Sequence, residues 1–194
     1  MKLSVTTIAG LLITLWICQA QSTPTDPSSI SRPGPKPLLL EKNEGELRIW
    51  RQFAPETFMI KVSPKNNESQ HLVLMTEDLR AGDTIPMHKH LGQDEIVLIQ
   101  TGTVHVRLGN QERDLHAGGL VFIPAYTWVN MKVIGSEPAS LVAIFSAPGF
   151  ENHLRCASVP ANKKPTPMTL ADWKQCDHEG HVIYKDRGEE DPNN

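Results

Sequence analysis

Residues 82–102 read GDTIPMHKHLGQDEIVLIQTG, and the spacing within this stretch decides both the fold and the candidate site. Two histidines stand one residue apart, His88 and His90, and a carboxylate, Glu95, follows five residues later. Residues i and i+2 of a β-strand point to the same face, so both imidazoles can reach a common point. A turn at residues 91–93 would return the chain in a second strand that begins near Glu95. Two imidazoles and one carboxylate on adjacent strands form a ligand set for a divalent transition metal.

The same stretch resembles the first motif of the cupin superfamily, G-x5-H-x-H-x4-E-x6-G. Every fixed position is matched, by Gly82, His88, His90, Glu95 and Gly102. The resemblance implies an all-β fold, a cupin-type antiparallel jelly-roll barrel, with the metal held by the two histidines and the glutamate. Within the superfamily, the chain resembles the small single-domain cupins that are similar to quercetin dioxygenases.

The second cupin motif is only half present. Gly118 and Pro124 match it, but Tyr126 replaces its next glycine. Val129 stands where the family has the histidine that serves as a fourth metal ligand. The resemblance therefore implies either a metal with an open side or a site of reduced affinity. Three polar side chains are candidates for a replacement contact: Gln93, Tyr126 and His105.

The chain around the first motif, residues 38–150, is predicted to form the barrel. Short runs of alternating or β-branched residues, separated by Gly, Pro and Asn, indicate about ten strands with no helix between them. Besides the two ligand strands, the expected strands cover residues 46–53, 58–62, 70–79, 103–108, 112–116, 120–124, 128–134 and 140–146. Residues 63–67 are expected to form a turn.

Two segments precede the predicted barrel. Residues 1–20 combine Lys2 with a short apolar run and small residues at a cleavage site, which is typical of a secretory signal peptide. The alternative is an uncleaved membrane anchor. Residues 21–37 are rich in Pro and Ser and predict an extended linker. The mature protein is expected to be secreted, extracellular or periplasmic, with no membrane association after cleavage.

A helical and irregular tail is expected over residues 151–194. Residues 149–158 and 169–175 predict two short helices, the second opened by a Thr–Asp capping pair. Cys156 and Cys176 are expected to form a disulfide in an oxidising compartment. The polar run DHEGH, residues 177–181, is interpreted as solvated tail.

The charge balance and the resemblance together define two functional hypotheses. With 19 basic and 22 acidic residues, the mixed charge predicts no nucleic-acid partner. The resemblance implies a cupin that binds Fe, Mn, Ni, Cu or Zn and acts as a dioxygenase or isomerase on a small oxygen-rich molecule, with Glu95 as catalytic base. The alternative is a non-catalytic module for a small ligand or sugar, or a dimerising scaffold, with a degenerate metal site. The resemblance also implies a homodimer.

Overall fold

The computed structural model describes residues 34–188 of the 194-residue chain. The predicted signal peptide and most of the predicted linker lie outside the described residues, as do the last six residues of the tail. Residues 34–37 are exposed and have no regular secondary structure. No helix in the described part is long and apolar enough to cross a membrane.

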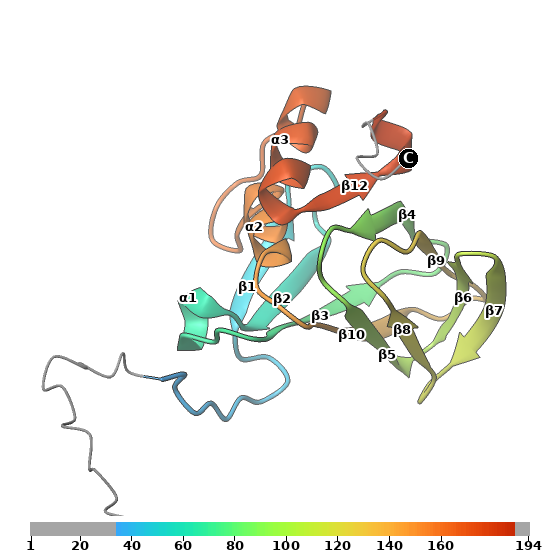
Figure 1. Ribbon diagram of the computed structural model, residues 1–194, viewed down its shortest axis with the longest axis horizontal. Helices are drawn as coiled ribbons and strands as arrows, with labels where there is room; N and C mark the ends of the chain where they lie inside the picture. The colour runs from blue at the N-terminus through green and yellow to red at the C-terminus, as the bar shows by residue number, and fades with distance from the viewer. Residues whose placement is uncertain (1–33, 189–194) are drawn as a thin grey trace, which may run out of the picture. The chain divides into compact units, whose positions relative to one another are not determined.

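Two antiparallel sheets form the fold, as the alternating patterns predicted (Figure 1). The seven-stranded sheet has the order β11-β1-β2-β3-β10-β5-β8, and the five-stranded sheet the order β12-β4-β9-β6-β7. The strands are β1 (Glu46–Trp50), β2 (Thr57–Val62), β3 (Val73–Leu79), β4 (Thr84–His90), β5 (Glu95–Thr101), β6 (Thr103–Leu108), β7 (Gln111–His116), β8 (Leu120–Ile123), β9 (Val129–Val133), β10 (Ala139–Phe145), β11 (Ser158–Pro160) and β12 (Val182–Tyr184). The helices are α1 (Pro64–Asn67), α2 (Phe150–Cys156), α3 (Leu170–Gly180) and the 3-10 turn η1 (Lys185–Arg187). This mostly β architecture confirms the predicted jelly-roll class.

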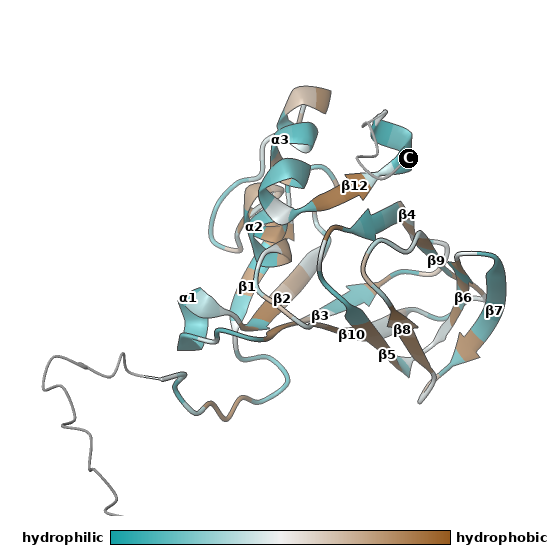
Figure 2. Ribbon diagram, viewed as in Figure 1, coloured by the Kyte–Doolittle hydropathy of each residue, from teal (hydrophilic) through white to brown (hydrophobic). Residues whose placement is uncertain are grey.

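The core lies between the two sheets because the strands alternate in burial. On β10 the residues 139, 141, 143 and 145 are buried, and on β9 the residues 129, 131 and 133 are buried. Each such set of side chains points to one face of its sheet. The edge strand β7 is largely exposed and is mostly hydrophilic in Figure 2, as expected for a strand that must not pair further.

Most strand predictions match the structure to within a few residues, and two local predictions are wrong. Residues 63–67 form the one-turn helix α1 rather than an open turn. Its N-cap is Ser63, whose hydroxyl accepts a hydrogen bond from the Asn66 backbone, and Pro64 follows at the first helical positions. The second error concerns the tail.

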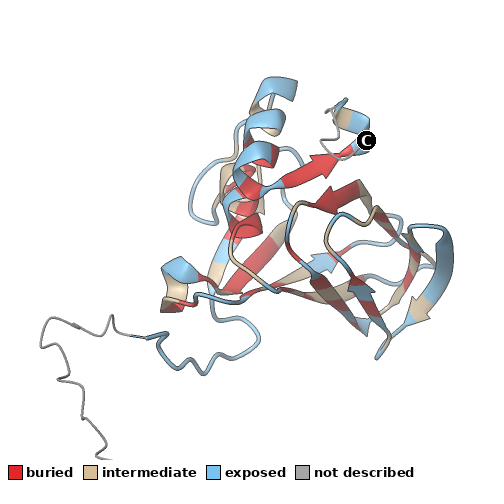
Figure 3. Ribbon diagram, in the orientation of Figure 1, coloured by how far each residue is buried: buried red, intermediate tan, exposed pale blue. Residues whose placement is uncertain are grey.

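The C-terminal segment is part of both sheets rather than a solvated tail. Helix α3 continues to Gly180, and Asp177 within the DHEGH run is fully buried. Strand β11 pairs with β1, and β12 pairs with β4, with Tyr184 directly opposite His88. Figure 3 shows β12 and the end of β4 as buried. The predicted boundary at residue 150 therefore separated segments that pack into the same sheets.

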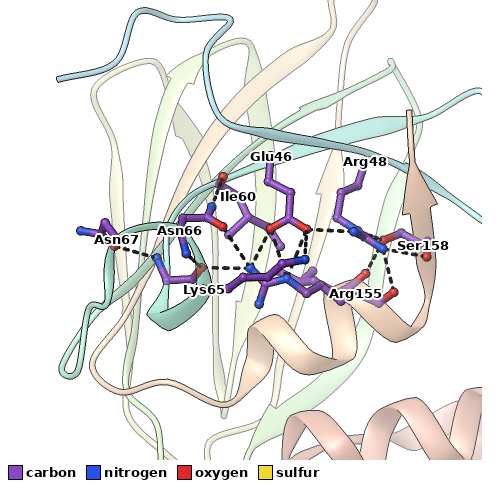
Figure 4. Close-up of polar contacts among 10 residues, drawn as sticks. Glu46, Arg48, Ile60, Lys65, Asn66, Asn67, Arg155 and Ser158 are labelled. Carbon is purple, nitrogen blue, oxygen red and sulfur yellow. Dashed lines mark hydrogen bonds and ion pairs between the residues drawn. The ribbon is translucent and has the colours of Figure 1, made fainter. Parts of the chain in front are cut away.

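Two sets of contacts hold α2 in place: a disulfide to α3 and an ion pair to β1. A disulfide joins Cys156 to Cys176, with their Cα atoms 5.3 Å apart, which confirms the predicted bridge. Arg155 of α2 donates to the Glu46 carboxylate on β1 at 2.7 Å, and Arg48 on the same strand donates to Ser158 at 2.6 Å (Figure 4). The start of α3 also has the predicted capping box, in which the Thr169 and Asp172 side chains each bond to the other residue's backbone N–H.

Candidate metal centre

Three buried side chains converge where β4 ends and β5 begins. His88 and His90 occupy alternate positions of β4, and Glu95 opens β5 after the turn, as the spacing predicted. One potential ligand atom from each lies within 4.8 Å of the others. The exposed fractions of the three residues are 4%, 1% and 6%, so the group is enclosed by protein.

Several potential metal-ligand atoms of the cluster make no hydrogen bond within the protein. Neither ring nitrogen of His90 nor Oε2 of Glu95 has a hydrogen-bond partner in the described part of the chain, although the His90 Nε2–Glu95 Oε2 distance is 3.2 Å. Buried polar atoms without partners are costly. A divalent cation would satisfy one ring nitrogen of His90 and the Glu95 oxygen, so these residues fit a metal.

His88 is also prepared to act as a ligand. Its Nδ1 lies 2.8 Å from the Pro86 carbonyl, which can only accept, so Nδ1 carries the proton and Nε2 offers its lone pair. Burial, followed by the nearby His90, lowers the pKa of His88 to about 4. The imidazole is therefore neutral at pH 7, which is the state that binds metals.

The two strands that flank β4 place Val129 and Tyr184 beside His88. Val129 of β9 is directly opposite His88 and fully buried. Directly opposed residues of antiparallel strands share a face, so this valine stands where a histidine would approach the same cluster. On the other side, the Tyr184 ring stacks on His88 with centroids 5.2 Å apart. The sequence interpretation missed this tyrosine because it assigned β12 to the tail.

The three candidate replacement contacts have different surroundings. His105 lies on β6 with its Nδ1 2.6 Å from Asp114 of β7, and its side chain is partly exposed, outside the cluster. Tyr126 is 52% exposed. Gln93 is buried, and its side-chain amide donates to the Ala147 carbonyl at 3.0 Å. The Gln93 Oε1 atom is buried and has no hydrogen-bond partner in the described part of the chain, whereas His105 is not among the converging ligand atoms.

A cavity of about 370 Å³ opens from the cluster into the space between the sheets. His88 and Glu95 line it, and apolar and aromatic side chains form most of its wall. These include Met75, Val97, Met131, Leu141, Phe145 and Phe150. A cavity of this size with a largely apolar wall is typical of a small-molecule site.

Another carboxyl group, Glu77 of β3, also lines the cavity, as do Glu56 and Asp83. Glu77 is opposite Leu141 of β10, and Glu95 is opposite Phe145 on the other side of the same strand. These two partners are four residues apart, so the backbones of Glu77 and Glu95 are offset by about 13 Å along β10. Trp50 Nε1 donates to Glu77 Oε1 at 2.7 Å. Burial, only partly offset by this bond, raises the pKa of Glu77 to about 7.

A histidine that the sequence interpretation did not consider lies on the cavity wall. His153 of α2 is 1% exposed, and its Nδ1 is 3.0 Å from Oδ1 of Asp177 on α3. The two residues are far apart in sequence, and no spacing rule connects them. The only available signal was the polar DHEGH run that contains Asp177, within a segment otherwise expected to be exposed.

Comparison with known families agrees with the fold and the first motif. Residues 75–145 match the family described as Cupin domain, and this segment carries both ligand strands. This segment of the chain is therefore a cupin domain. No curated protein matches the chain.

Solved structures that resemble the chain do so at low identity. The Bacillus halodurans protein BH2720 is 20% identical over 59% of this chain and 84% of its own, with a TM-score of 0.46. A predicted oxalate decarboxylase from Thermotoga maritima is 16% identical over 57% of this chain and 100% of its own, with a TM-score of 0.48. An RmlC-like cupin from Shewanella frigidimarina is 14% identical over 59% of this chain and 94% of its own, with a TM-score of 0.47.

Proposed function

We propose that this cupin is a metal-dependent enzyme of the dioxygenase or isomerase type that acts on a small oxygen-bearing molecule. One observation carries the proposal: three buried ligand residues converge, with atoms of His90 and Glu95 lacking hydrogen-bond partners, and His88 and Glu95 line a cavity whose wall is largely apolar. His88, His90 and Glu95 would hold Fe, Mn, Ni, Cu or Zn. When bound, such a metal supplies a Lewis acid that orients and polarises an oxygen of the substrate.

The residues of the chain have distinct roles in this proposal. The two imidazoles would hold the metal in position, and the Pro86 carbonyl orients the His88 ring. Glu95 has two carboxylate oxygens, so it can bind the metal and also accept a proton as the catalytic base. The apolar wall excludes water from the reacting groups. The predicted signal peptide and the disulfide support the proposal that the protein works outside the cytoplasm.

The experiment that tests this function is turnover by protein reconstituted with each metal in turn. Oxygen uptake and product formation would be measured with a panel of small phenols and enediols. We expect Glu95→Gln to lower turnover by at least about a hundredfold, the usual contribution of a general base. Glu112→Gln, an exposed carboxylate of β7, is the matched control and should keep wild-type turnover.

The second candidate, a non-catalytic small-molecule or sugar-binding cupin, is favoured by Val129 at the position of the fourth ligand. Binding of panel compounds by the wild type without turnover, for every metal, would support this second function and contradict the first.

A further inference from the structure

A buried histidine outside the metal centre lines the same cavity and lies beside a buried carboxylate. His153 lines the cavity, and Asp177, which is fully buried, engages its Nδ1 at 3.0 Å. Arg187 of η1 forms an ion pair with the same carboxylate. The Arg187 guanidinium also lies over the rings of Trp173 and Tyr184, at 4.1 and 3.8 Å from their centroids. The contacts of Arg187 fix Asp177, whose Oδ1 stays within 3.0 Å of His153 Nδ1 although the two atoms do not have hydrogen-bond geometry in this structure.

His153 lies near the metal centre but does not touch it. The Phe150 ring stands between His90 and His153, with centroid distances of 4.6 and 5.1 Å. The Tyr184 ring stands in the same way between His88 and His153, at 5.2 and 5.6 Å. His153 is therefore separated from each of the two metal-ligand histidines by one aromatic ring. One small molecule in the cavity can therefore reach both places.

The chemistry of the pair suits proton transfer at the free nitrogen. Since Nδ1 faces Asp177, Nε2 is the ring nitrogen left for a ligand. Burial lowers the pKa of His153, which the Asp177 carboxylate only partly offsets. The other charged or titratable groups near it are Arg187 from η1 and His90 from β4. The imidazole is therefore neutral at pH 7, and Asp177 can stabilise the cation that forms when it takes up a proton.

We propose that His153 accepts a proton from a hydroxyl group of the molecule bound in the cavity, with Asp177 and Arg187 as positioning residues. In this step the ligand O–H bond breaks, its electron pair stays on oxygen, and an N–H bond forms at Nε2. Asp177 remains ionised beside the imidazolium. The inference rests on the proposed function, because it takes the cavity as the substrate site. It narrows the substrate to small molecules with a weakly acidic hydroxyl, such as a phenol or an enol.

A purely structural role for the cluster is the competing explanation. A buried ion pair stabilises a fold little more than apolar residues of similar volume would. An aromatic cluster of Phe150, Trp173 and Tyr184 already packs around His153. If His153 accepts the proton, a bound phenol should lose its proton only when His153 is present. If the cluster is purely structural, the ionisation of a bound phenol should not depend on His153.

The probe is 4-nitrophenol, whose absorption distinguishes the neutral phenol from the phenolate. It would be titrated into the mature chain, both zinc-loaded and stripped by a chelator, at a pH where the free probe is mostly neutral. His153→Phe keeps an aromatic ring but cannot take a proton, and His153→Gln serves if the phenylalanine variant does not fold. The matched control is His105→Phe, which removes the partly exposed His105–Asp114 pair on β6 and β7.

We expect the wild type and His105→Phe to bind the probe as phenolate. In His153→Phe the bound probe should remain neutral, and its affinity should fall on the order of tenfold to hundredfold, as for loss of a charge-assisted hydrogen bond. The same phenolate spectrum in the variant and the wild type would overturn the proposal, as would failure of the wild type to bind. A wild type that ionises the probe but retains no zinc would support this inference while removing the proposed function.

Discussion

At the scale of single residues, His88 contacts most of the groups that define the site. Its backbone pairs with Val129 on one side and Tyr184 on the other. The Pro86 carbonyl sets its tautomer, and burial keeps it neutral. A change at either flanking residue therefore acts on the ligand cluster directly.

Val129→His should tighten metal binding because it places an imidazole opposite His88 on a buried wall. Loss of an outer contact to a metal ligand costs roughly 10–100-fold in affinity, so a new direct ligand should gain at least about tenfold. Affinity would be measured by competition with a chelator at one pH. Val133→His, further along the same face of β9, is the control and should leave affinity unchanged. Equal affinities for Val129→His and the wild type would show that this position does not face the metal.

At the scale of elements, the ligand strands could be predicted and the elements around them could not. The histidine spacing and the turn at residues 91–93 specify β4 and β5. Strand β6 covers the residues over which the sequence alternates. Strand β12 has three residues, too few to show a period, and it follows the polar run of α3. Its burial depends on pairing with β4, a contact between residues far apart in the chain. The His153–Asp177 pair depends on the same packing, so sequence spacing could not indicate it.

Strand β3 makes a prediction of its own, because one polar residue interrupts its inward-facing set. Val73, Met75 and Leu79 are buried, and Glu77 shares their face. Its pKa is raised to about 7 from 4.5, so between these values the unfolded carboxyl ionises while the folded one keeps its proton. Wild-type stability is therefore lost through Glu77 as the pH rises through this window.

Glu77→Gln should accordingly be more stable than the wild type at pH 8, by about 1–3 kcal/mol, and close to it at pH 4.5. Glutamine retains an oxygen that can accept from Trp50 Nε1. Urea unfolding at the two pH values, in the presence of a chelator, measures the difference. Glu137→Gln, on an exposed loop, should show no such change with pH. A Glu77→Gln advantage that is equal at both pH values would contradict the assigned titration.

At the scale of the whole described part, two sheets and the C-terminal segment enclose one cavity with distinct polar groups. The family motif predicted the group at His88, His90 and Glu95. Glu77 and His153 add two further groups that could not be predicted from the sequence, because each is brought to the cavity by strand register or helix packing. The enclosing segment is held by the disulfide between α2 and α3 and by the pairing of β12 with β4.

Elemental analysis of the protein, purified without a histidine tag, tests most directly whether His88, His90 and Glu95 hold a metal. We expect close to one transition metal per chain in the wild type. His88→Ala combined with His90→Ala should contain none while keeping the circular dichroism of a folded β protein. His105→Ala combined with His116→Ala, on the outer strands β6 and β7, should keep the metal. A wild type that retains no metal after reconstitution, or a His88/His90 double variant with full occupancy, would contradict the account.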